Sequence, residues 1–89
     1  MDKSTDRIIR CFDYARLVKQ TTIPIITVYD HPTDYPDKYV ARVFDMDRPT
    51  NLAAIADTYE ELLEAIPTQS MARMGRNPKD DPVIMETWI

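Results

Sequence analysis

The apolar positions at the start of the chain repeat with the period of an α-helix. They share one stripe about 120° wide on a helical wheel: Ile8, Cys11, Phe12, Ala15 and Val18. Asp6 and the two residues before it carry side-chain oxygens that can cap free backbone N–H groups. The pattern therefore predicts a helix over residues 5–20. Ile9 and Leu17 fall off this stripe, so we expect them to meet another element or a partner.

Two strand patterns come next. Residues 25–29 are β-branched or aromatic, with Pro24 at the entry, which is typical of a strand. Residues 38–45 read as a second strand, in which successive side chains point to opposite faces of the sheet. The two sets are Tyr39, Ala41 and Val43, and Val40, Arg42 and Phe44. The stretch 30–37 holds two X-Pro pairs among aspartates, which predicts a turn and hence a hairpin.

A capping signal organises the second half of the chain. Asp57 followed by Glu60 is similar to a capping box and predicts a helix that ends at Pro67. Ala and Leu in residues 51–56 favour helix, but the cap comes after them, so we interpret them as a short strand. The other predicted elements are a turn at 46–49, an extended stretch at 68–74, a turn at 75–82 and a strand at 83–89.

The predicted order, α-β-β-β-α-β-β, indicates an α+β fold. We expect a small, mostly antiparallel sheet with two helices packed on one face. At 89 residues the chain should form a single domain over 1–89. A domain of this size has little hydrophobic surface to bury, which favours stabilisation by a protein partner or by a second copy in a homodimer.

Few residues are available for chemistry. Cys11 is the sole cysteine, which excludes an internal disulfide and a Cys-based zinc site, and we interpret it as a small buried hydrophobe. His31, the sole histidine, lies in a turn beside Asp30 and is interpreted as a solvated turn residue. One glycine cannot build a phosphate loop, and the loop aspartates lack the spacing of a calcium loop. We therefore predict no catalytic residue, no metal and no cofactor.

Location follows from the charges and the apolar runs. The first 20 residues carry charges throughout, which excludes a signal peptide, and no apolar run is long enough to span a bilayer. We expect a cytoplasmic protein with no membrane partner.

The net charge of −4 is unevenly distributed. The predicted helix after Asp57 carries an acidic face with two aspartates expected nearby, and Trp88 is either core or an interface anchor. The acidic candidates for protein binding are Glu60, Glu61, Glu64, Asp45 and Asp47. A basic stretch without an internal acid offers the alternative of a weak nucleic-acid contact. Its candidates are Arg73, Arg76 and Lys79, together with Arg42.

Residues 39–45 read YVARVFD and residues 56–66 read ADTYEELLEAI. These segments, about a third of the chain with the turn between them, resemble the N-terminal domain of HicB-type antitoxins. The resemblance implies a partial ferredoxin-like sheet of three strands with a helix packed across it. Met46-Asp47-Arg48-Pro49 replaces the Leu-Pro-Gly turn of that family, a helix is expected before the first strand, and the chain ends VIMETWI without a DNA-binding segment. Antitoxin function and residue roles are therefore not transferred.

These observations favour a small non-enzymatic protein-binding or regulatory module. Such a module, for example an accessory protein of a phage or mobile element, would inhibit its partner through an acidic surface. Two alternatives stay open: a weak nucleic-acid binder that uses residues 73–79, and a small enzyme that uses His31.

Overall fold

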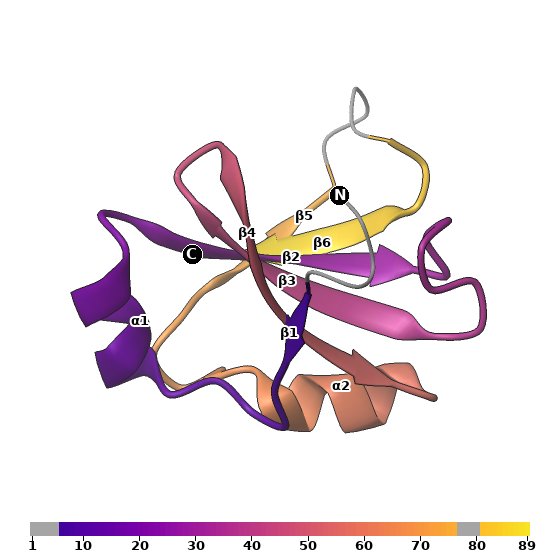
Figure 1. The fold of residues 1–89 in the computed structure, drawn as a ribbon, viewed down its shortest axis with the longest axis horizontal. Coiled ribbons are helices and arrows are strands. Elements are labelled where there is room, and N and C mark those ends of the chain that lie inside the picture. The colour runs from indigo at the N-terminus through magenta and orange to yellow at the C-terminus, as the bar shows by residue number, and fades with distance from the viewer. Residues whose placement is uncertain (1–5, 77–80) are drawn as a thin grey trace.

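The computed structural model describes residues 6–76 and 81–89, which form six strands and two short helices (Figure 1). In chain order they are β1 (Arg7–Ile8), α1 (Tyr14–Gln20), β2 (Pro24–Asp30), β3 (Tyr39–Asp45), β4 (Arg48–Ala56), α2 (Tyr59–Ala65), β5 (Arg73–Gly75) and β6 (Ile84–Trp88). The strands lie side by side in the order β1-β4-β3-β2-β6-β5. β1 runs parallel to β4, and the other neighbours are antiparallel. An α+β fold with a mostly antiparallel sheet matches the prediction, but the predicted order of elements is wrong because β1 precedes the first helix.

The helix predicted over residues 5–20 is confirmed only in its second half. α1 begins at Tyr14, because Asp13 is the N-cap and its carboxylate accepts a hydrogen bond from the backbone N–H of Ala15 at 3.1 Å. The predicted cap at Asp6 is therefore wrong. The segment before α1 pairs with β4 instead, which is a long-range interaction that local periodicity does not report.

The predicted apolar stripe of this helix is also wrong. Leu17, placed off the stripe, is buried, whereas Val18, placed on it, is 48% exposed. Cys11 is exposed, so its interpretation as a buried hydrophobe is wrong. Phe12 is buried as expected, although it lies in the loop before α1, and Ile9 packs partly buried against the core.

The predicted hairpin is confirmed, since β2 pairs with β3 along its whole length. The alternation of β3 is also correct: Ala41 is buried in the main core, whereas its neighbour Arg42 faces the other side of the sheet. The strand predicted at 51–56 exists but begins earlier, at Arg48. The turn predicted at 46–49 is correspondingly shorter.

The helix predicted between Asp57 and Pro67 is α2. Its N-cap is Thr58, whose hydroxyl accepts from the backbone N–H of Glu61 at 3.1 Å, so the predicted cap at Asp57 is one residue too early. The Asp57 carboxylate instead accepts a hydrogen bond from the ammonium group of Lys38, just before β3.

The C-terminal part agrees with the prediction in outline. The stretch predicted as extended at 68–74 begins with a turn and becomes a strand only at Arg73, where β5 starts. The strand predicted at 83–89 is β6. The turn predicted at 75–82 lies partly outside the described residues.

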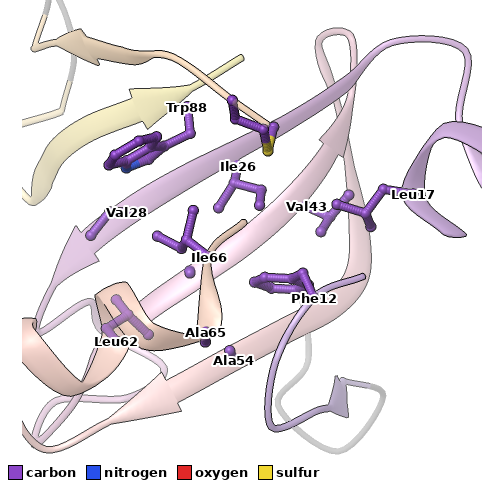
Figure 2. Packing of buried hydrophobic residues seen from close by; sticks show 12 residues of the cluster. Phe12, Leu17, Ile26, Val28, Val43, Ala54, Leu62, Ala65, Ile66 and Trp88 are labelled. Atoms are coloured by element: carbon purple, nitrogen blue, oxygen red, sulfur yellow. The ribbon is translucent and has the colours of Figure 1, made fainter. Parts of the chain in front are cut away.

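Both helices contribute to one hydrophobic cluster on one face of the sheet. Figure 2 shows its labelled side chains gathered between the strands, α2 and the start of α1. Leu17 of α1 and Leu62 of α2 are among the most deeply buried side chains of the chain's described part. The cluster consists of Phe12, Leu17, Ile26, Val28, Ala41, Val43, Ala54, Leu62, Ala65, Ile66, Met71 and Trp88.

The opposite side of the sheet, which we call the open face, has no helix in contact with it in the described structure. Residues that pair directly across neighbouring strands point to the same side of a sheet. One row of paired residues crosses all six strands: Ile8, Ala53, Arg42, Thr27, Thr87 and Met74. Beside it lie a second row of Ile55, Val40, Tyr29 and Ile84, and a third of Pro49, Phe44 and Ile25.

Candidate functional site

The open face contains a hollow of about 270 Å³. Its walls come from β2, β3 and β4 and from the loop between β2 and β3. The lining residues are Tyr29, Pro32, Asp34, Val40, Arg42, Phe44 and Pro49. Aromatic and proline side chains thus surround one guanidinium group and one carboxylate.

The guanidinium of Arg42 is held by a buried carboxylate. Nη1 of Arg42 donates to Oδ1 of Asp6 at 3.0 Å, and Nη2 donates to Oδ2 at 2.8 Å, so the pair is two-pronged. The two side chains are 8% and 0% exposed. Nη1 also donates to the Thr50 carbonyl at 2.9 Å, which is available because the register of β3 and β4 shifts at this point.

Tyr35 completes this group. Its side chain is buried, and its hydroxyl donates to Oδ2 of Asp6 at 2.8 Å. Hydrogen bonds from Arg42 hold the pKa of Asp6 below its usual 3.8, although burial acts in the opposite direction. Burial, together with the neighbouring Asp6 carboxylate, raises the pKa of Tyr35 to about 12. At neutral pH Asp6 is therefore an anion and Tyr35 a neutral hydrogen-bond donor.

Replacing Tyr35 by phenylalanine is expected to flatten the alkaline side of the stability profile. The folded-state pKa of about 12 lies above the ordinary 10.0, so this tyrosine stabilises the fold fully below pH 10 and loses that effect as the pH rises through 12. Urea unfolding of both proteins between pH 7 and pH 12 measures the difference. At pH 7 the variant should lose about 1.5–3 kcal/mol, the usual contribution of a hydrogen bond to a charged group. Tyr14→Phe, on α1, is the control; an equally steep alkaline decline in all three proteins contradicts the prediction.

The charged groups that line the hollow are the Arg42 guanidinium and the Asp34 carboxylate. Oδ2 of Asp34 lies 3.6 Å from Nη2 of Arg42, an ion-pair distance that is too long for a good hydrogen bond. Two carboxylates, Asp6 and Asp34, therefore face one guanidinium. The Asp34 side chain is 33% exposed and lines the hollow.

The predicted acidic protein-binding residues do not form one surface. Glu60, Glu61 and Glu64 are exposed on α2, and the last two lie near Ile55 at the end of β4. The two aspartates expected nearby lie at the opposite end of β4, so that expectation is wrong. There, the Asp45 carboxylate accepts hydrogen bonds from the backbone N–H groups of Thr22 and Ile23, and Asp47 is exposed in the turn.

Trp88 belongs to the core, where it is 8% exposed. Its indole Nε1 donates to Oε2 of Glu86 at 2.7 Å. Glu86, 2% exposed, also accepts from the Tyr59 hydroxyl at 2.7 Å and from Nε of Arg73 at 2.8 Å. This second buried carboxylate lies on the helix-covered side of the sheet and ties β5 and α2 to β6.

The predicted basic residues are likewise separated. Arg42 faces the open side, whereas Arg73 pairs with Trp88 on the helix-covered side. Arg76 is exposed, and Lys79 lies outside the described residues. The geometry therefore does not bring Arg42 and Arg73 together for a nucleic-acid backbone.

His31 is exposed where β2 ends, and its Nδ1 contacts the Asp30 carboxylate. Its ring meets that of Tyr39 edge-on, with centroids 4.8 Å apart. Within residues 6–76 and 81–89, no group of three His, Cys, Asp or Glu side chains is arranged to hold a metal ion. α1 and α2 have seven residues each, which is too short to cross a bilayer. Among the described residues, no helix exceeds this length.

The sequence analysis did not name four residues of the groups around Arg42 and Glu86 as site residues: Asp6, Asp34, Tyr35 and Glu86. A usable signal did exist for two sites. Arg42 and Glu86 are single charges inside otherwise apolar alternating strands, a position where a charge needs a buried partner. The partners themselves are distant in sequence and could not be identified from spacing.

No protein-family model, no curated protein and no solved structure matches this chain.

Proposed function

We propose that the chain is a non-enzymatic protein-binding module that docks a basic partner on the open face of its sheet. The observation that carries this proposal is the arrangement of the two layers. Both helices pack on one side, while the other side carries a hollow lined by aromatic, proline and charged side chains, beside a smaller buried cluster of Tyr35, Val40 and Ala53.

The apolar character of the open face supports a protein partner. Ile8 and Met74 stand at the two ends of the row that crosses the sheet, and they are 44% and 49% exposed. Between them, the half-buried rings of Tyr29 and Phe44 line the hollow. The centre of the row is buried, so these exposed and half-buried apolar groups lie at separate places on the face. Exposed apolar side chains among polar ones are a feature of protein interfaces.

Charge supports a basic partner. The chain carries a net charge of −4, and the loop between β2 and β3 contributes Asp34 to the lining of the hollow and carries the exposed Asp37. Complementary potentials accelerate association and disfavour acidic competitors. The acidic face of α2, Glu60, Glu61 and Glu64, is the competing surface for the same class of partner.

The resemblance to HicB-type domains stays a prediction, and no residue role is taken from it.

Introducing a cation on the open face should abolish docking. In Thr87→Arg, the new side chain lies on the row between Thr27 and Met74, where it adds bulk and repels a basic surface. We expect capture of the partner from lysate by the immobilised variant to fall about tenfold or more. The matched control is Gln69→Arg, which adds the same charge at an exposed turn after α2.

The outcomes separate the candidate surfaces. Loss of a captured protein in Thr87→Arg, with retention in Gln69→Arg and in a Glu60→Gln, Glu61→Gln, Glu64→Gln variant, supports the open face. The reverse pattern assigns docking to α2 and overturns the proposal. A second copy as occupant would appear in light scattering as a dimer of the wild type that Thr87→Arg dissociates.

A further inference from the structure

We infer that the cleft between α1 and the β1–β4 edge of the sheet binds a small phosphomonoester with an apolar body. Leu52, which lines this cleft, packs against the main hydrophobic cluster, and Arg7 is its partner on β1. Partners on neighbouring strands point to the same side of a sheet, so the cleft lies on the helix-covered side. It is separate from the hollow on the open face, and the inference does not depend on the proposed docking of a protein.

The cleft consists of two hollows of about 310 Å³ and 190 Å³ that share four lining residues: Arg7, Leu17, Gln20 and Leu52. Arg16 also lines the larger hollow. Because Arg16 and Gln20 are four positions apart on α1, they lie on one side of that helix. Polar groups from α1 and β1 therefore converge on one space.

The two arginines of the cleft lack a carboxylate partner. Arg42 and Arg73 each form an ion pair, whereas no carboxylate of the described residues pairs with Arg7 or Arg16. Asp13 lines the larger hollow too, but its Oδ1 accepts from the backbone N–H of Ala15 as the cap of α1. Residues 7–20 contain four basic residues against this one acid, although the chain has a net charge of −4. The charge that the cleft lacks is an anion.

The arrangement of the cations favours a phosphate group. A guanidinium donates two parallel N–H groups, which one planar carboxylate can satisfy alone. A phosphomonoester has three terminal oxygens and nearly two negative charges, so it can accept from Arg7 and Arg16 together.

The floor of the cleft is apolar. Leu17 is 2% exposed, and Ile9 and Leu52 are partly buried against the main cluster. The larger hollow reaches the lower end of the range of about 300–1,000 Å³ that holds small organic ligands. The cleft therefore has room for the apolar body of the ester beside its phosphate.

Titration of the ¹⁵N-labelled protein with phenyl phosphate, inorganic phosphate, benzoate and phenol tests this inference. We expect saturable amide shifts at Arg7, Arg16 and Gln20 with phenyl phosphate, about tenfold weaker binding of inorganic phosphate and of benzoate, and none of phenol.

Variants identify the groups that bind. Arg7→Gln and Arg16→Gln should each weaken the binding of phenyl phosphate about fivefold, whereas Asp13→Asn, which can still cap α1, should strengthen it about threefold. The matched control is Arg76→Gln, which removes the same charge just after β5, at the opposite edge of the sheet, and should leave binding unchanged.

Three results would overturn the inference. Shifts that do not saturate, or equal weakening by Arg16→Gln and Arg76→Gln, mean that phosphate meets the protein only as a general counter-ion. Equal affinity for benzoate, inorganic phosphate and phenyl phosphate removes the assignment of a phosphomonoester with an apolar body. An oligothymidine that binds more tightly than phenyl phosphate, with steep loss in salt and in Arg10→Gln and Lys19→Gln, assigns this basic end to a nucleic acid instead.

Discussion

Replacing Glu86 by alanine is expected to lower the free energy of unfolding by about 3 kcal/mol. The carboxylate is 2% exposed and accepts hydrogen bonds from Trp88, Tyr59 and Arg73. Its removal leaves the indole N–H and the phenol without their acceptor, at about 1–3 kcal/mol for each buried donor. Arg73 adds little, because its side chain is 58% exposed and can return to water. Urea unfolding followed by the fluorescence of Trp88, the sole tryptophan, measures the loss.

The pH dependence gives a second measure of the same carboxylate. Burial raises the pKa of Glu86, but hydrogen bonds from Tyr59, Arg73 and Trp88 outweigh it and hold the pKa below the usual 4.5. Stability from this group is therefore present above pH 4.5 and is lost as the pH falls through the folded-state value. Glu86→Gln should flatten this acid decline. Glu64→Ala, at an exposed position on α2, is the control and should cost less than about 0.5 kcal/mol. Equal losses in Glu86→Ala and Glu64→Ala contradict the prediction.

The parts of the fold that were predicted correctly depend on local signals. The β2–β3 hairpin follows from β-branched residues, alternation and a proline-rich turn, all contained in residues 24–45. α2 follows from a cap and from Leu62 at helical spacing. The prediction for the start of the chain was wrong because Asp6 and Asp13 are both suitable N-cap residues. Which of them caps the helix depends on tertiary contacts. Parallel pairing of β1 with β4 joins residues about 45 positions apart, which no local pattern encodes.

The candidate site was predictable only in part, for the same reason. Alternation correctly placed Arg42 on the side of β3 opposite to Ala41 and Val43, but it did not say which side faces the core. Its partner Asp6 is 36 positions away and was interpreted as a helix cap. The acidic residues were grouped because each lies near a turn or a helix start, but β4 separates Asp45 from Glu61 by most of its length. Charge patterning identifies exposed charges, whereas a site made of buried charges needs the register of the sheet.

Replacing Arg42 by methionine is expected to cost about 3–5 kcal/mol at pH 7, the usual effect of removing one partner from a buried ion pair. Methionine fills a similar volume, so the loss reports the charge rather than a cavity. The Asp6 side chain is 0% exposed, and of its donors Arg42 and Tyr35 it would keep only the Tyr35 hydroxyl. Its pKa, held low chiefly by Arg42, should rise, so the carboxyl group should bind a proton on folding. The cost should therefore shrink toward pH 4, where wild-type Asp6 begins to lose its own stabilisation.

A double-mutant cycle measures the interaction energy between Arg42 and Asp6 separately from the cost of each single substitution. Asp6→Asn in the wild type leaves the Arg42 guanidinium with a neutral partner, whereas Asp6→Asn in Arg42→Met removes a buried charge that already lacks its partner. The second substitution should therefore restore stability, and the coupling between the two sites should reach about 1–3 kcal/mol. Purely additive losses in urea unfolding contradict this interpretation and mean that Asp6 is hydrated once Arg42 is gone. Restoration, in contrast, means that this pair determines how the N-terminal segment joins the open face, because Asp6 directly precedes β1 and Arg42 stands at the centre of the sheet.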